Sequence, residues 1–327
     1  MSGPMLDVQN LSVTFQGDGG PVYAVRDLSL RLAPGEVIGI VGESGSGKSV
    51  TMMSVLRLLD TRRTEISATE LAVDGQSLLG LPAGALQDLR GPVVSYIFQD
   101  PLTALNPLLT VGRQLTEGMR RHAGLGRAEA RAKALDLLRR VGIPAPELRI
   151  DQMPHQLSGG MRQRVMIAIA LACDPKLLIA DEPTTALDVT VQAEIVRLVQ
   201  SIQAERGMAM VWVTHDLALL ARLADRVVVM YAGRIIEDAP ARTLYSSPGH
   251  PYTAGLLAST SRIDDPFTEQ TSIPGMPPDP RRIAPGCSFA PRCTRALAQC
   301  QTVVPPLVQQ PDGRRLACFN PLPEAHT

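Results

Sequence analysis

Aromatic side chains, excess charge and long apolar runs are all scarce in this sequence. Aromatic residues make up 3% of its 327 residues, and Lys and Arg balance Asp and Glu to a formal net charge of zero. No nucleic-acid partner is expected, because binding one usually requires a basic excess and rings that stack on bases. The longest predicted apolar helix, 165–173, is far shorter than the about 20 residues that cross a bilayer. The first residues lack the basic and apolar regions of a signal peptide, which predicts a cytosolic chain.

Apolar residues are nevertheless plentiful enough for a packed core. They make up 45% of the chain, whose length allows one large domain and a small appendage. The composition shifts towards proline beyond Ser247. This shift predicts a main domain over 1–247 and a C-terminal extension over 248–327.

A glycine-rich loop lies between a predicted strand, 37–41, and a predicted helix. Residues 42–49 fit the phosphate-loop pattern G-x-x-x-x-G-K-[ST]. N–H groups of such a loop face phosphate oxygens, and the helix N-terminus adds roughly half a positive charge. Lys48 would reach the β- and γ-phosphates, and the Ser49 hydroxyl would bind Mg²⁺. Without further motifs, the pattern could also be a flexible turn. The residues expected to contact the nucleotide here are Gly42, Ser44, Gly45, Ser46, Gly47, Lys48, Ser49 and Val50.

Two acids end a second apolar strand, predicted over 176–180. A continuous apolar run is typical of a strand buried on both faces of a parallel sheet, and ligands bind at the C-terminal ends of such strands. Asp181 is therefore expected to hold Mg²⁺ through water, and Glu182 to orient and deprotonate the attacking water. His215 closes another apolar strand, where it would contact the γ-phosphate. The competing interpretations are two solvated acids and a structural histidine.

A second anion-binding helix terminus is predicted at Ser158, Gly159 and Gly160, which precede an apolar helix. With the elements above, residues 5 to 245 resemble the ATP-binding cassette (ABC) family. The resemblance implies an α/β P-loop NTPase cassette with a RecA-like core, an antiparallel β subdomain and a helical subdomain. It also implies a head-to-tail dimer, in which each ATP lies between one subunit's phosphate loop and the partner's signature serine and glycines.

The same resemblance implies roles for other residues. Gln99 matches the glutamine that contacts Mg²⁺ and the attacking water, and 186–188 match the loop that crosses the dimer interface. Phe15 is the first candidate for the aromatic that stacks on adenine, and Tyr23 is the alternative. Met161 stands where many ABC cassettes have glutamine, beyond the residues expected to touch phosphate. No catalytic position is degenerate, so the resemblance implies an active ATPase.

Residues 100–155 are predicted to form a helical arm with a break at 142–146. In importers of the ABC family this arm grips a cytoplasmic helix of a membrane subunit. The stretch 100–107 is then expected to relay ATP binding to the permease, although it could also be an ordinary proline-capped loop. The arginine-rich stretch 120–131 is interleaved with acids and alanines, which predicts a solvated helical face.

Four of the five cysteines cluster in the proline-rich extension, at Cys287, Cys293, Cys300 and Cys318. This segment has few apolar residues, which suggests that something other than a hydrophobic core organises it. A reducing cytosol disfavours disulfides. Four thiolates suit a [4Fe–4S] cluster or Zn²⁺, and the absence of Cys-x-x-Cys spacing favours the cluster over zinc or free thiols. The fifth, Cys173, is predicted to be a packed core thiol in the apolar helix.

The extension also contains 249–253 and 273–275, and with the cysteines it resembles that of the oligopeptide and dipeptide importer ATPases. Several of those hold an iron–sulfur cluster there. The run 177–191 is similar to the D-type subunit of that family. The resemblance implies a heterodimer with an F-type ATPase subunit, two membrane permeases, an extracytoplasmic solute-binding protein and a position at the cytoplasmic face of the membrane. It implies uptake of peptides, with a nickel chelate or glutathione as alternative solutes. A soluble ABC ATPase without a transport role is the alternative from another class.

Overall fold

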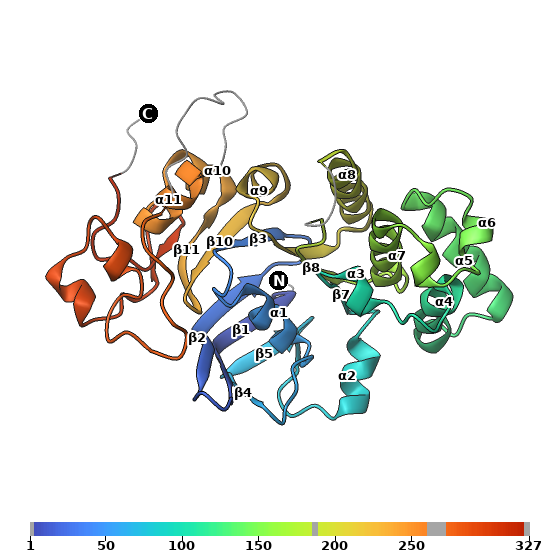
Figure 1. Cartoon of the computed structure of the whole chain (residues 1–327), viewed down its shortest axis with the longest axis horizontal. Helices are drawn as coiled ribbons and strands as arrows, with labels where there is room; N and C mark the ends of the chain where they lie inside the picture. The colour runs from blue at the N-terminus through green and yellow to red at the C-terminus, as the bar shows by residue number, and fades with distance from the viewer. Residues whose placement is uncertain (1–2, 185–188, 260–272, 324–327) are drawn as a thin grey trace. The chain divides into compact units, whose positions relative to one another are not determined.

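The computed structural model describes residues 3–184, 189–259 and 273–323 (Figure 1). The chain divides into two compact units. Unit 1 comprises Met1–Met5, Ala33–Glu36 and Val73–Val211. Unit 2 comprises Leu6–Leu32, Val37–Ala72 and Trp212–Thr327. All described residues of the predicted extension belong to unit 2.

Unit 2 begins with an antiparallel sheet. Its strands are β1 (Leu6–Phe15), β2 (Val22–Leu32), β4 (Thr64–Ser67) and the first part of β5 (Glu70–Val73). Strand β1 pairs with both β2 and β4. Side chains of β1 alternate between buried and partly exposed over most of its length, as expected for a sheet with one face on the core.

A second sheet in unit 2 carries the phosphate loop. The sheet has eight strands, of which those in unit 2 follow the order β12 (Val308–Gln309), β13 (Arg315–Leu316), β11 (Arg234–Pro240), β10 (Arg226–Tyr231) and β3 (Val37–Val41). Strand β3 is fully buried and lies parallel to β10, so the strand predicted over 37–41 is confirmed. The helices of unit 2 are α1 (Lys48–Val55), α9 (Leu217–Leu223), α10 (Ala241–Ser246) and α11 (Pro251–Ser259).

Unit 1 contains the strand with the two acids and the helical arm. Strand β8 (Leu177–Asp181) lies parallel to β7 (Val94–Ile97) and beside β9 (Ala209–Val213). The boundary between the two units falls within β9. The short β6 (Gln76–Ser77) also lies in unit 1. The helices are α2 (Ala83–Leu89), α3 (Pro101–Ala104), α4 (Val111–His122), α5 (Arg127–Arg140), α6 (Pro146–Arg149), α7 (Gly159–Leu171) and α8 (Val189–Arg206). The arm is helical and is interrupted between α5 and α6, as predicted.

Two details of unit 1 differ from the sequence predictions. The arginine-rich stretch 120–131 is not one helical face, because α4 ends at His122 and α5 begins at Arg127. Cys173 does not lie in the apolar helix, which ends at Leu171; its thiol is half-buried rather than in the core. Burial raises the pKa of this thiol. None of the helices in the described parts of the chain has both the length and the apolar character that a bilayer crossing requires.

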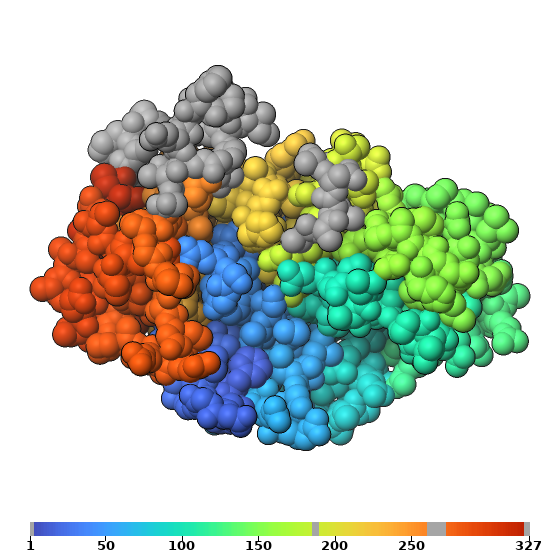
Figure 2. Space-filling view, viewed as in Figure 1, coloured from blue at the N-terminus to red at the C-terminus, as the bar shows by residue number. Residues whose placement is uncertain are grey.

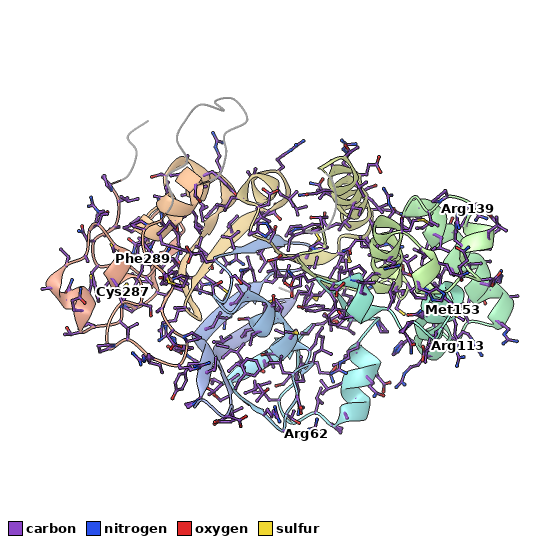
Figure 3. The ribbon with its side chains drawn as sticks, in the orientation of Figure 1. Arg62, Arg113, Arg139, Met153, Cys287 and Phe289 are labelled. Carbon is purple, nitrogen blue, oxygen red and sulfur yellow. The ribbon has the colours of Figure 1, made fainter. Side chains whose placement is uncertain are left out.

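The extension has an aromatic core, contrary to the prediction that it lacks an apolar one. Phe289 packs edge-on against Tyr231 and Tyr252, with ring centroids 5.3 and 5.4 Å away, and lies 5.6 Å from His250. Figure 3 shows Phe289 beside Cys287. Few aromatics are needed because each ring buries a large apolar area. The described residues 273–323 form a continuous orange to red part of the surface in Figure 2.

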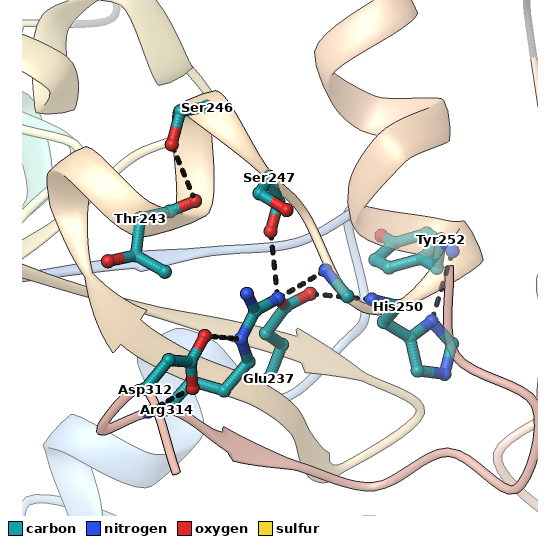
Figure 4. A network of polar contacts seen from close by, with 9 residues as sticks. Glu237, Thr243, Ser246, Ser247, His250, Tyr252, Asp312 and Arg314 are labelled. Atoms are coloured by element: carbon teal, nitrogen blue, oxygen red, sulfur yellow. Dashed lines mark hydrogen bonds and ion pairs between the residues drawn. The ribbon is translucent and has the colours of Figure 1, made fainter. Parts of the chain in front are cut away.

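A buried carboxylate ties the extension to β11. Glu237 is fully buried and accepts hydrogen bonds from the backbone N–H groups of Gly249 and His250, at 2.7 and 2.9 Å (Figure 4). Arg314 lies 3.4 Å from the same carboxylate and donates to the carbonyl of Ser247 at 2.8 Å. Since Glu237, His250 and Arg314 are buried, the network fixes the start and the far end of the extension on one strand.

Candidate functional site

The phosphate loop of unit 2 curls so tightly that two of its positions require glycine. Gly42 has φ 152°, and a Cβ there would lie 2.2 Å from the Met230 carbonyl oxygen. Gly47 has φ 99°, and its Cβ would lie 2.4 Å from the carbonyl oxygen of Ala24. Any larger residue would both strain the backbone and clash with a neighbouring strand.

Lys48 lies at the first turn of α1, followed by Ser49 and Val50, as predicted. Its ammonium group donates to the carbonyl oxygens of Gly42 and Glu43, at 2.7 and 3.1 Å. The buried Lys48 therefore closes the loop on itself. The same ammonium can turn to phosphate oxygens, because a lysine chain is flexible and its charge has no directional preference.

A hollow lies beside the loop residues Glu43–Ser46. Tyr23 and the extension segment 277–280 line it, and the Tyr23 N–H donates to the Pro280 carbonyl at 2.9 Å. Phe15, the first candidate for adenine stacking, ends β1 and is not among the residues that line the hollow. Adenine stacking by either ring stays a prediction.

In unit 1, Asp181 ends β8 and is almost fully buried. The hydroxyl of Tyr96, on the neighbouring β7, donates to its Oδ2 at 2.7 Å. Burial, and then the charge of Asp181, raise the pKa of Tyr96 far above its ordinary value, so the hydroxyl stays a donor. Sequence reasoning missed Tyr96, because no pattern in its own segment points to an acid 85 residues further along the chain.

Glu182 follows β8 in a left-handed backbone conformation, with φ 46°. Such a conformation is uncommon for a residue other than glycine and is concentrated at functional sites. The side-chain amide of Gln99 donates to its Oε2 at 3.1 Å. The structure thus brings together Gln99 and Glu182, which lie 83 residues apart and which the sequence assigned to the same reaction. The amide oxygen of Gln99 keeps its acceptor capacity for a metal ion or water.

The signature residues begin α7 in unit 1. Ser158 is the N-cap, and its Oγ accepts a hydrogen bond from the Met161 N–H at 3.3 Å. Gly159 and Gly160 form the first turn, where unpaired N–H groups and the helix dipole favour an anion. Gln163, one turn further on, donates to the carbonyl of Pro183, so α7 is linked to the residue after Glu182.

The sequence predicted two further site elements. His215 belongs to unit 2 and follows β9 with an exposed side chain. Residues 186–188, predicted to cross a dimer interface, lie outside the described residues.

Comparison with known proteins identifies the family. Residues 25–185 match the family model described as ABC transporter. A relative in Brucella melitensis, whose name describes a peptide import ATP-binding protein, is 50% identical over 323 residues, or 98% of this chain and 96% of the relative. The chain belongs to the ABC transporter family. It is an ATPase of that family, and the resemblance seen in its motifs is confirmed. A relative of the same description in Brucella ovis is 47% identical over 97% of both chains.

The extension and the fold of this ABC ATPase have matches of their own. Residues 236–300 match the model described as oligopeptide/dipeptide transporter, C-terminal region. A dimeric ATP-binding cassette solved with ADP and phosphate is 30% identical, with a TM-score of 0.65, over 73% of this chain and 99% of that one. A cassette from Clostridium perfringens, part of an ABC transporter complex, is 29% identical with a TM-score of 0.60, over 74% and 90%. The predicted α/β P-loop cassette fold is confirmed.

The four cysteines of the extension line one cavity, together with His250 and Phe289. The N–H groups of Arg295 and Leu297 lie 3.4 Å from the sulfurs of Cys293 and Cys300. Within 3–184, 189–259 and 273–323, no three His, Cys, Asp or Glu side chains are grouped closely enough to hold a metal ion. The thiols thus share a cavity without the compact spacing of a single-ion site.

Proposed function

We propose that this ABC ATPase couples ATP binding and hydrolysis to the import of di- and oligopeptides across the cytoplasmic membrane. The observation that carries the proposal is the match of residues 236–300 to the oligopeptide/dipeptide transporter C-terminal region. These residues follow the ATP-site motifs in the chain. Full-length relatives named for peptide import support it. A nickel chelate or glutathione is the alternative cargo, and a soluble ABC ATPase without a permease is the less favoured alternative.

The proposed chemistry assigns a role to each predicted residue. Glu182 accepts the proton of the attacking water, while the Gln99 amide, bonded to it, orients both. Oxygen ligands such as those of Ser49, Gln99 and Asp181 suit Mg²⁺, which supplies charge neutralisation at the phosphates when bound. His215 contacts the γ-phosphate. Ser158, Gly159 and Gly160 hold the ATP of the partner subunit, in keeping with their position at a helix N-terminus.

The proposed assembly follows from the importer family. The chain pairs with a second ABC ATPase, an F-type subunit, and binds two permeases at the cytoplasmic face of the membrane, where a solute-binding protein delivers cargo from outside. Residues 1–247 act as the nucleotide-binding domain and 248–327 as the transporter-type extension. Closure of the ATPase pair on ATP would move the helical arms, and hydrolysis would reset them.

Uptake of labelled di- and tripeptides by cells tests the proposal. A strain lacking this gene is complemented with the wild type, Glu182→Gln or Glu205→Gln. Glu205 is an exposed acid on α8, paired with Arg140, and serves as the control. We expect the wild type and control to restore uptake, and Glu182→Gln to retain ATP binding but lose about 100-fold or more in hydrolysis. A wild type that restores nickel or glutathione uptake but not peptide uptake would contradict the peptide assignment.

We further propose that Cys287, Cys293, Cys300 and Cys318 hold a [4Fe–4S] cluster. The shared cavity and the N–H groups directed at two sulfurs support this ligand set. Iron, sulfide and zinc are measured in protein purified without oxygen, beside Cys293→Ser. We expect about four irons per chain and a loss of iron in the variant. Stoichiometric zinc, or no metal, would overturn the cluster and leave the ATPase assignment intact.

A further inference from the structure

Glu43 places a carboxylate inside the phosphate loop. It is the second residue of the G-x-x-x-x-G-K-[ST] pattern, and its carbonyl oxygen accepts one of the Lys48 hydrogen bonds at 3.1 Å. Its backbone N–H donates to the Tyr252 hydroxyl at 2.9 Å. An uncompensated negative charge here would repel the phosphates that the loop binds, because charges a few ångströms apart at a protein surface interact appreciably.

Arg292 of the extension compensates that charge with a two-pronged contact. Its Nη1 and Nη2 donate to the two carboxylate oxygens of Glu43, at 2.8 and 3.0 Å. The two residues lie 249 positions apart in the chain. A planar guanidinium matches a carboxylate in this bidentate geometry, which fixes orientation as well as charge.

The remaining donors of Arg292 are also in use. Nε donates to the Pro274 carbonyl at 2.9 Å, Nη2 to the Ile273 carbonyl at 3.3 Å and Nη1 to the Tyr231 hydroxyl at 3.3 Å. With the two bonds to Glu43, all five N–H groups of the guanidinium are accounted for. The side chain is 5% exposed, and hydrogen bonding to Glu43 is the first cause that raises the pKa of Arg292. Arg292 is therefore held in a single position against the loop.

We propose that Arg292 is a positioning residue for ATP binding: it neutralises Glu43 and, with Tyr252, holds the phosphate loop in its binding conformation. The extension is thereby part of the machinery of the ATP site. This inference rests on ATP binding by the loop, and it is independent of the transported solute and of the metal in the cysteine cavity.

Equilibrium binding of a fluorescent ATP analogue to the full chain tests the role. Arg292→Met leaves the Glu43 carboxylate uncompensated, and we expect the dissociation constant to rise about tenfold. Adding Glu43→Gln to that variant removes the repelling charge, and we expect affinity to return to within about threefold of the wild type. A purely structural arginine would not be rescued by a second change in the loop.

Arg31→Met is the matched control, because it makes the same change at an exposed arginine, whose side chain pairs with Asp7 on β1. It is expected to bind the analogue as the wild type does. Wild-type affinity in Arg292→Met, or a double variant as weak as Arg292→Met, would overturn the inference. If Arg292→Met does not fold, Glu43→Gln alone decides: binding at least as tight as that of the wild type is expected, and weaker binding would refute the charge argument. Failure of the wild type to bind would instead refute the ATP site.

Discussion

At the scale of single residues, the structure adds a positioning group to the proposed magnesium site. The Tyr96 hydroxyl bonds to one oxygen of the buried Asp181 carboxylate, on the adjacent strand. Groups that orient a metal ligand typically change metal affinity when they are removed, even though they do not touch the metal. Tyr96 is therefore expected to matter for Mg²⁺ more than for ATP itself.

Tyr96→Phe tests this expectation. The variant keeps the ring and loses the hydroxyl, so we expect the Mg²⁺ concentration for half-maximal ATPase activity to rise about tenfold. Tyr245→Phe is the control, since that part-buried hydroxyl donates to the Leu217 carbonyl rather than to Asp181. Equal Mg²⁺ requirements in the two variants would show that Tyr96 does not orient the carboxylate.

At the scale of elements, the N-cap residue of α7, Ser158, has two roles that can be tested separately. The Ser158 side chain caps the helix through the Met161 N–H, and the family resemblance gives it a contact with the partner's ATP. Thr110 caps α4 in the same way, through the Arg113 N–H at 3.3 Å, without any proposed nucleotide contact.

The variants Ser158→Ala and Thr110→Ala should therefore differ in ATPase activity but lose similar stability. Each is expected to lower the free energy of unfolding by about 1 kcal/mol, the usual cost of a lost N-cap. Only Ser158→Ala should also reduce the ATPase activity of the assembled transporter. Urea unfolding and an ATPase assay report the two effects, and equal activities would argue against a role of Ser158 beyond capping.

At the scale of the whole molecule, the extension is joined to the cassette by buried charge and aromatic packing. Glu237 has no exposed surface and Arg314 is 6% exposed at its side chain, so neither group can recover hydration if its partner is removed. Breaking one side of such a buried pair is costly, whereas an exposed pair contributes little.

Arg314→Met is expected to lower the free energy of unfolding by about 3–5 kcal/mol, because it leaves the Glu237 carboxylate buried beside an apolar side chain. Arg31→Met breaks the pair with Asp7, in which Arg31 is 67% exposed, and should cost less than about 1 kcal/mol. Denaturant unfolding of both variants makes the comparison. A similar small loss in the two would mean that the extension is not held through Glu237.

Local sequence patterns determined much of this protein. The strand before the phosphate loop and the helix after it follow from an apolar run and glycine spacing, and the strand before Asp181 follows from a continuous apolar run. These elements depend on near neighbours in the chain, and the structure has them where they were predicted. The partnership of Gln99 with Glu182 also agrees with the sequence, although through the family resemblance rather than through periodicity.

Only the tertiary structure decided the contacts between distant segments. Nothing in the spacing of Arg292 indicates that it holds Glu43, and nothing near Tyr96 indicates its bond to Asp181. The aromatic core of the extension was missed because Tyr231 comes from β10 and Phe289 from the proline-rich segment. Such contacts arise when strand pairing brings remote side chains together. Composition and periodicity describe each segment alone and cannot specify which segments meet.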